Sequence, residues 1–401
     1  MMVYYAFRNC LRHPRRAALV VLTIGLGTFG LFLYHGLNNG LLSQYRTNTI
    51  HAKYGHGQVF RKGFYGQVHE EPWKFWLDDY QAVQKNLLAL PEVSQVFPRI
   101  SFSGLLSNGH TSVNALGSGV DGAEEKKFFD KLNVIEGQAT NGDPQKIILG
   151  VGLARALQVK PGDHITVLVS TLSGTMNALD LELSGIFQIG ARDIDDRFFQ
   201  IEFSAAQQLL DTRGAESIAV ALKNDGEWNA VSTYVSDPAL NLEAIPFEVL
   251  DKIYYGNSVA WLGKQFAIFQ VIILFIVLLG VFTTVSVSIL ERREEFGFLR
   301  SNGESRWYIA QVLLLEALLL SIIGSVCGLI FAFFVNESLL AKGLAMPPAP
   351  GFTLPFDFKI ILNLAQGLKV GLLCLGTTLF ATVLAGARCL SGSISQNMRA
   401  T

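Results

Sequence analysis

The sequence Glu291-Arg-Arg-Glu-Glu-Phe-Gly-Phe-Leu-Arg-Ser-Asn-Gly-Glu-Ser-Arg306 is a short, densely charged segment between two long apolar runs, residues 265–290 and 308–336. A charged helix this short cannot pack a core of its own. Its apolar side chains must therefore lie against the bilayer or a partner while its charges face away. Gly303, preceded by Asn302, predicts the end of the helix. The segment is placed to receive force from a soluble protein, and an ordinary charged loop of a membrane protein fits the spacing equally well.

Four apolar runs are long enough to cross the ~30 Å hydrocarbon layer of a bilayer. They predict transmembrane helices at residues 17–45, 263–290, 308–336 and 363–387. Basic residues before the first run favour a cytoplasmic N-terminus, and a cleavable signal peptide is the weaker alternative because no small-x-small cleavage site follows. The other segments are then a cytoplasmic amphipathic helix at 1–16, an extracytoplasmic domain at 46–262, a charged cytoplasmic helix at 291–307, an external loop at 337–362 and a cytoplasmic tail at 388–401.

The charge distribution supports this topology. Only 16% of the residues are charged, which is low for a soluble protein. Residues 41–262 carry 18 Lys and Arg against 26 Asp and Glu, a net charge of −8, and the rest of the chain carries 14 against 7, or +7. An acidic block and a basic remainder indicate opposite sides of a bilayer, with both termini in the cytoplasm and the large domain outside.

The segment 46–262 has the pattern of a mixed α+β domain. A helix is predicted at 78–89, and strands at 93–106 and 111–117 join through the turn Asn108-Gly109. The Gly-x-Gly at 117–119 lacks the third glycine of a nucleotide loop and is interpreted as a turn. The four cysteines have no metal-ligand or disulfide spacing, and five histidines of the domain are scattered. No Walker motif, nucleophile elbow or His-Glu-x-x-His is present, so a membrane enzyme is disfavoured.

Several motifs together resemble one family. The Glu291–Gly303 stretch precedes an apolar helix with Leu315-Glu316-Ala317 and Gly324-x-x-x-Gly328. These features are similar to the signature of the FtsX/MacB-type ABC permeases, in which this stretch is a coupling helix that docks on a separate ATPase. Asn302 departs from the usual apolar residue. The order Leu-Gly-x-x-Leu-Ala (149–154), Gly-Asp, Gly-Ile-Phe and Ala-Gln-x-Leu within the domain resembles the lipoprotein-releasing (LolC/LolE-like) permeases, although residues 169–180 lack their chaperone-recruiting hook.

The resemblance implies an α-helical membrane protein with four transmembrane helices and a MacB-periplasmic-core-like α+β domain. It also implies a permease subunit without catalytic activity, for which a cytoplasmic ABC ATPase dimer binds ATP and Mg²⁺. The implied work is extraction of lipoproteins or another amphiphile from the inner membrane. A second permease subunit (the same or different), membrane lipids and a lipoprotein or periplasmic protein are the expected partners, and nucleic acid is not. The residues implied in ATPase coupling are Glu291, Arg292, Arg293, Glu294, Glu295, Phe296, Gly297, Leu299, Arg300 and Gly303.

Two other functions fit the same features. An FtsX-like mechanotransmission protein would activate a periplasmic cell-wall hydrolase without transport, although such proteins have a smaller external domain. A peptide or drug efflux permease is the other alternative, although such permeases often carry the ATPase on the same chain.

Glu316 and the paired glycines are the notable residues inside the spans. A carboxylate at this depth marks function by default. Equally, at ~1.5 Å per residue it lies only about 12 Å deep and could reach a cation such as Arg300. Gly324 and Gly328 predict close helix packing, within the subunit or across a dimer.

By the same resemblance, the first span of one protomer faces the second span of another. That arrangement predicts a lateral cavity for acyl chains, and ordinary lipid-facing or interhelical packing is the alternative. The predicted lining residues are Leu31, Phe32, His35, Phe266, Phe269, Ile273 and Phe275.

Overall fold

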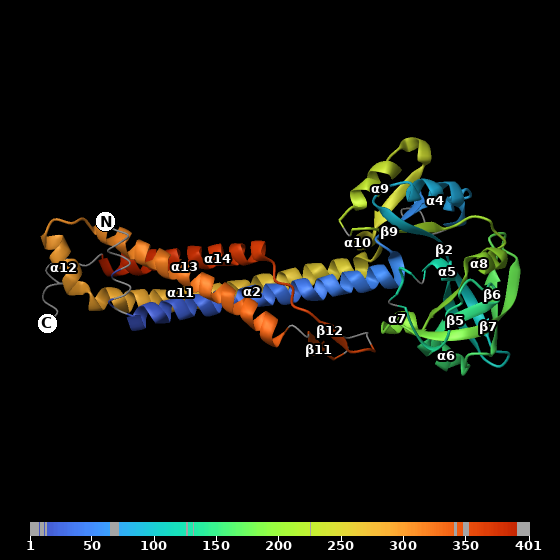
Figure 1. Ribbon diagram of the computed structural model, residues 1–401, viewed down its shortest axis with the longest axis horizontal. Helices are drawn as coiled ribbons and strands as arrows, with labels where there is room; N and C mark the ends of the chain where they lie inside the picture. Colours follow the sequence, from blue (N-terminus) through green and yellow to red (C-terminus); the bar gives the residue numbers. More distant parts are fainter. Residues whose placement is uncertain are drawn as a thin grey trace. The chain divides into compact units, whose positions relative to one another are not determined.

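The structure is a computed structural model (Figure 1), and it describes residues 8, 12, 14–64, 72–125, 127–130, 132–224, 226–340, 343–347 and 353–390. Most of the predicted amphipathic helix at 1–16 and of the tail at 388–401 lies outside these residues. The chain divides into a helical unit, residues 1–43, 258–344 and 357–401, and an α/β unit, residues 44–257 and 345–356.

The helical unit contains four helices, among the described residues, that are long and apolar enough to cross a membrane. They are α2 (Pro14–Thr49), α11 (Asn257–Glu291), α13 (Arg306–Leu339) and α14 (Leu364–Leu390), with the short α12 (Arg293–Ser301) between α11 and α13. Helix α2 and the following π-helical turn η1 (Ile50–Tyr54) run past the predicted end at residue 45, and α11 begins before residue 263. Polar residues beyond a span do not stop a helix, so these helices extend past the apolar runs that predict them.

Glycines let the apolar helices approach closely. A β-carbon added at Gly324 of α13 would lie 3.0 Å from both Cβ of Ile24 and the Val21 carbonyl oxygen of α2. One added at Gly328 would collide with the Gly25 carbonyl oxygen. The predicted packing of this glycine pair is therefore within the subunit, against α2.

The α/β unit is built on a ten-stranded mixed sheet with the order β10-β1-β9-β2-β3-β8-β5-β7-β4, in which β6 pairs with β2 and β7. The strands are β1 (Gly57–Arg61), β2 (Val93–Ser107), β3 (Ser112–Val120), β4 (Asn133–Gly137), β5 (Lys146–Gly150), β6 (His164–Ser170), β7 (Met176–Gln188), β8 (Phe198–Glu202), β9 (Ser217–Leu222) and β10 (Leu242–Pro246). A separate two-stranded sheet is formed by β11 (Leu344–Met346) and β12 (Phe356–Phe358).

Short helices cover this sheet and connect its strands. They are η2 (Pro72–Phe75), α4 (Tyr80–Leu88), α5 (Gly122–Glu125), α6 (Val151–Leu157), α7 (Arg192–Asp195), α8 (Phe203–Leu210), α9 (Trp228–Val235), η3 (Pro238–Leu240), α10 (Phe247–Leu250) and η4 (Lys252–Gly256). The predicted helix at 78–89 is α4, which Asp79 caps by accepting the Ala82 N–H at 3.3 Å. The mixed α+β fold class and the four apolar helices are confirmed.

Strand β2 is shared by two parts of the sheet. Its residues 93–99 pair with β9, and its residues 100–107 pair with β3. Around the first part lies a core that includes Val59, Leu87 and Val220, and around the second lies a core that includes Ile100 and Ile201. The long strand thus runs through both hydrophobic cores.

The interpretation of Gly117 and Gly119 as a turn was wrong. Both glycines lie inside β3, where Gly117 pairs with Phe102 and Phe199. A β-carbon at Gly117 would meet the rings of both phenylalanines at 2.5 Å. Glycine is required here by the space that the two rings occupy.

Candidate coupling site

Helix α12 is a separate helix set off from α11 by a break at Arg292. Glu294 and Glu295 lie in its first turn and Arg300 in its last turn, which suits the helix dipole. Its end is a Schellman motif, in which the Glu304 N–H donates to the Leu299 carbonyl at 3.1 Å and the Gly303 N–H donates to the Arg300 carbonyl at 3.2 Å. Gly303 has a φ of +90°, so the predicted stop is explained by a conformation that favours glycine.

One face of α12 packs on the neighbouring helices. Phe296 is 5% exposed and belongs to a small core that also contains Ile289 of α11, Ile309 of α13 and Ala385 of α14. Phe298 lies on the opposite face and is 68% exposed. Residues two apart in a helix do not share a face. Helix α12 therefore has an anchored face and a free apolar side chain.

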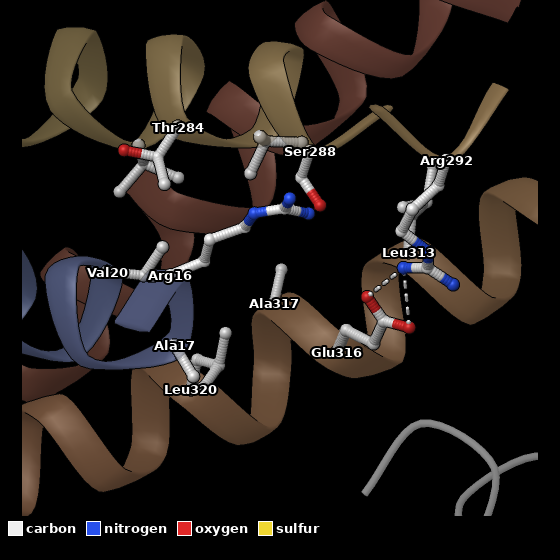
Figure 2. Close-up of a pocket in the computed structure, with 12 residues that line it drawn as sticks. Arg16, Ala17, Val20, Thr284, Ser288, Arg292, Leu313, Glu316, Ala317 and Leu320 are labelled. Carbon is white, nitrogen blue, oxygen red and sulfur yellow. Dashed lines mark hydrogen bonds and ion pairs between the residues drawn. The ribbon is translucent and has the colours of Figure 1, made fainter. Parts of the chain in front are cut away.

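The break before α12 is held by a buried arginine. The Arg292 Nη1 donates to the two carboxylate oxygens of Glu316 at 3.2 and 3.0 Å (Figure 2). Its Nε donates to Glu295 at 3.0 Å. The guanidinium carbon also lies 4.9 Å from the centre of the Phe296 ring. Arg292 is only 4% exposed, so these charge-assisted contacts form in a poorly solvated place.

A second arginine, Arg16 of α2, lies close to the Arg292 ion pair. Arg16 forms an ion pair with Glu291 at the end of α11, and Figure 2 shows its side chain extending toward Ser288. Arg16, Arg292 and Glu316 line a cavity of about 590 Å³ whose other walls are mostly aliphatic side chains of α2, α11 and α13. Three apolar helices and α12 are thus joined by two ion pairs around one cavity.

The structure changes two of the predicted roles. Glu316 pairs with Arg292 and not with Arg300, because Arg292 stands at the helix break, where its side chain turns toward α13. Arg292 was expected among the residues of a docking surface. Its burial places it between helices instead, and Phe296 and Gly297 are buried with it.

The exposed part of the predicted coupling set is smaller. Glu291, Glu294, Glu295 and Gly303 are exposed, and Arg293, Leu299 and Arg300 are partly buried. Two aromatic side chains of this surface, Phe298 and Trp307, are each 68% exposed and were not among the predicted coupling residues. Helical spacing was the available signal, since 298 lies on the face opposite 296.

The predicted acyl-chain cavity is contradicted at its first-span residues. Leu31 and Phe32 are both fully buried inside this chain, where Phe32 packs edge-on to Phe333 at 5.5 Å. His35 stacks on Phe266 of the same chain at 4.5 Å, so the first and second spans face each other within one subunit.

Two members of that set remain exposed. Phe269 is 44% exposed and Phe275 is 58% exposed, whereas Ile273 packs at the edge of the core of the helical unit.

Comparison with known proteins identifies the family. Residues 17–237 match the family model described as the MacB-like periplasmic core domain, which covers more than half of the chain. Residues 267–394 match the FtsX-like permease C-terminal model. The chain belongs to the FtsX/MacB-type ABC permeases. The family resemblance drawn from the coupling stretch and the domain motifs is therefore confirmed, and this permease is a membrane protein with a periplasmic-type domain.

Curated relatives of the permease include subunits of lipoprotein-releasing systems. It is 22% identical over 277 residues to the lipoprotein-releasing system transmembrane protein LolE of Haemophilus influenzae, a match over 65% of this chain and 64% of LolE. It is 26% identical over 267 residues to LolC of Xylella fastidiosa (strain Temecula1), a match over 63% of each protein. The permease therefore spans slightly less than two thirds of the length of these relatives.

Among solved structures, the periplasmic region of MacB from Actinobacillus actinomycetemcomitans superposes with a TM-score of 0.37 and 12% identity, over 49% of this chain and 91% of that one. The extracellular domain of YknZ gives a TM-score of 0.34 and 13% identity, over 47% and 98%. Scores this low carry no argument, so the fold rests on the structure and on the family models.

Proposed function

We propose that this permease is the membrane subunit of an ATP-driven machine in the inner membrane. Helix α12 faces the cytoplasm and docks on an ABC ATPase dimer, which binds ATP and Mg²⁺. The α/β unit lies in the periplasm, and the permease pairs with a second permease subunit. The observation that supports this role is α12 itself, whose Phe298 is free while its Arg292 end is tied to α13.

Force on α12 has a defined route into the helical unit. A displacement of α12 pulls on the Arg292 guanidinium, and the Glu316 carboxylate then transmits the load to α13. Phe296 transmits a second part of the load through its packing against Ile289 and Ile309. Loss of either partner would leave the other charge buried and uncompensated, at a cost of about 3–5 kcal/mol.

The same motion reaches the periplasmic side through covalent continuity. Helix α2 continues through η1 into β1, and α11 follows directly from η4. The Arg16–Glu291 ion pair joins α2 and α11 at the end nearest α12. A force on α12 is therefore transmitted to both α2 and α11, the two helices that continue into the α/β unit.

The substrate class that we favour is a lipid-anchored protein or another amphiphile. The support is the similarity to LolE and LolC, which are transmembrane proteins of lipoprotein-releasing systems. Phe269 and Phe275 expose apolar rings on α11, where an acyl chain could pack. Burial of each methylene would contribute ~0.8 kcal/mol.

The test is reconstitution. The full-length permease is purified with the ATPase and any second permease that accompany it, and is placed in proteoliposomes with a radiolabelled lipoprotein. ATP-dependent appearance of lipoprotein in the supernatant supports the proposal. If ATP is hydrolysed and the lipoprotein stays in the membrane, the substrate assignment fails, and export of peptides or activation of a cell-wall hydrolase is measured on the same vesicles.

Orientation is tested separately by single cysteines in a variant without the native cysteines. A cysteine at Asn224, exposed in the α/β unit, is expected to react with an impermeant thiol reagent in intact spheroplasts. A cysteine at Ser301, exposed at the end of α12, is expected to react only after lysis. Labelling of Ser301→Cys without lysis would reverse the orientation.

A further inference from the structure

The α/β unit contains a cavity that the coupling role does not use. It is open to solvent and is lined in part by Lys53, Arg99, Ser101, Ser118 and Gln200. One wall is η1, the turn that directly continues α2. Its other walls are strands of the sheet and the segment from Phe187 to Phe198.

The strand register gathers the polar side chains of this cavity in one row. Ser101 of β2 pairs with Ser118 of β3, and Ser118 pairs in turn with Gln200 of β8. Arg99 precedes Ser101 by two residues and pairs with Ser217 of β9. Directly paired residues, and residues two apart in one strand, lie on the same face of a sheet. Four neighbouring strands thus present hydroxyl, amide and guanidinium groups to one cavity.

Arg99 is a structural member of this row. It is 7% exposed, donates to Glu125 at 2.9 Å and to the Lys53 carbonyl at 2.6 Å, and lies 4.3 Å over the Phe129 ring. Its charge is therefore compensated by Glu125. Its bond to the Lys53 carbonyl fixes η1 against the sheet, which sets the position of the Lys53 side chain.

Lys53 is different, because no described residue forms an ion pair with its ammonium group. The group lies 4.6 Å from the Tyr54 ring centre and 5.4 Å from the Phe198 ring centre. The Asp251 carboxylate also interacts electrostatically with this ammonium group but forms no ion pair with it, so the partly buried cation can still attract an anion into the cavity. The hydroxyl group of Ser118 and the amide of Gln200 line the same cavity and can donate to such an anion, whereas the N–H and side chain of Ser101 are bonded to Glu216.

We propose that this cavity binds a phosphate ester, with Lys53 as the charged contact and Ser118 and Gln200 as hydrogen-bond donors. A tetrahedral anion presents its oxygens in several directions and so suits donors that arrive from two strands and a helix. Phe187, Ile189 and Ile194 supply an apolar wall for the organic part of the ester. Because η1 continues the first apolar helix, a phospholipid headgroup is one source of the ester, and a soluble phosphate ester is the other.

The experiment uses the full-length permease in maltoside micelles, which contain no phosphate. Binding of short-chain phosphatidylglycerol, and separately of glycerol phosphate, is measured by phosphorus NMR line broadening. The variants are Lys53→Met, which removes the charge, and Ser118→Ala, which removes one donor. Lys62→Met is the control, because Lys62 is an exposed lysine of the same unit outside this cavity.

We expect Lys53→Met to weaken binding about tenfold or more, since hydrogen bonds to charged groups contribute ~1.5–3 kcal/mol, and Ser118→Ala to weaken it several-fold. Lys62→Met binds as the wild type does. Binding of both probes assigns the site to phosphate esters in general, and binding of the lipid alone assigns it to a phospholipid. If the wild type binds neither probe, or if Lys53→Met and Lys62→Met bind equally, the proposal is wrong. Lys53→Arg, which keeps the charge, retains binding and controls for folding.

Discussion

The Arg292 guanidinium lies 3.0 Å from the Glu316 carboxylate, and this contact joins the break before α12 to the third apolar helix. Glu316 is ten residues from the start of α13 at Arg306, which at ~1.5 Å per residue is a distance of about 15 Å along the helix axis. A carboxylate at this depth is expensive without a partner. Arg292 supplies the partner from the residue just before α12. The ion pair therefore fixes the start of α12 against α13.

The first prediction concerns this pair. Glu316→Ala leaves Arg292 buried without its main counter-charge, so we expect the permease to lose about 3–5 kcal/mol of stability or to uncouple ATP hydrolysis from release. The measurements are thermal unfolding in detergent and ATPase activity of the reconstituted complex. The control Glu304→Ala removes an exposed acid from the loop after α12 and leaves both unchanged.

Exchanging the charges of Arg292 and Glu316 tests whether the two side chains stabilise the protein as a pair or only because both are polar. The double variant Arg292→Glu with Glu316→Arg restores opposite charges across the same gap. We expect it to recover part of the stability that each single variant loses. Strictly additive losses would show that the two side chains do not act as a pair.

The second prediction concerns the two faces of α12. Phe298→Asp places a charge on the exposed face, and we expect loss of ATPase co-purification with an unchanged unfolding temperature. Phe296→Asp buries a charge between helices and is expected to destabilise the protein itself. Affinity capture from membranes and thermal unfolding distinguish the two results. Full recovery of the ATPase with Phe298→Asp would contradict the docking face.

The third prediction concerns helix packing at Gly328. Gly328→Val places side-chain atoms against the Gly25 backbone of α2, and overpacking of this kind costs typically ~1–3 kcal/mol. We expect a lower unfolding temperature of the helical unit. Gly376→Val in α14 is the matched control, because a β-carbon there meets nothing within 4 Å. Equal effects of the two substitutions would show that the α2–α13 contact is not tight.

The fourth prediction concerns pH. Burial is the main reason that the pKa of Glu125 rises to about 7, and the neighbouring Arg99 partly opposes this rise. A raised pKa means that the folded state binds more protons than the unfolded state between the ordinary carboxyl pKa and about 7. Stability of the α/β unit therefore falls as pH rises through this window, by up to about 3 kcal/mol.

The measurement is thermal unfolding of the full-length permease at about pH 5 and about pH 8, compared with Glu125→Gln. The variant keeps a hydrogen-bond acceptor for Arg99 and is expected to show a smaller difference between the two pH values. Glu124→Gln, on the exposed side of the same turn, is the control and keeps the wild-type difference. A wild type that is less stable at the lower pH would oppose the assigned sign.

The fifth prediction concerns the proposed substrate path along α11. Phe269→Asp puts a charge on an exposed ring position, and we expect it to block lipoprotein release while assembly and ATP hydrolysis continue. Phe32→Asp is not an equivalent test, because Phe32 is fully buried and the substitution should unfold the helical unit. Release at the wild-type rate with Phe269→Asp would place the path elsewhere.

The sequence predicted correctly those elements whose signals lie within one short segment of the chain. Apolar length predicted the four long helices, and the turn residues Asn108-Gly109 predicted the hairpin of β2 and β3. Contacts between distant segments were not predictable in this way. Glu316 had several candidate cations within reach, and only the break at Arg292 selects one of them. Gly117 carries the signal of a turn, and only the rings of Phe102 and Phe199 reveal that it lies inside a strand.

The burial of Leu31 and Phe32 has the same explanation. An apolar residue in a membrane helix contacts lipid, a neighbouring helix or a substrate with similar energy, so residue type does not separate the three. The separation comes from helix rotation, which close contacts such as that of Gly27 with Val277 fix in the folded protein. Phe269 and Phe275, on α11, are rotated outward by the same contacts.

The sharing of β2 between two cores has a consequence for hydrogen exchange. Amide protons of residues 93–99 and 100–107 are held by different partner strands, β9 and β3, yet they belong to one uninterrupted backbone. Neither half of the strand can detach without straining the other, so both are expected to exchange in the same slow, correlated event. The two parts of the sheet that share β2 are therefore expected to respond to a pull as one body.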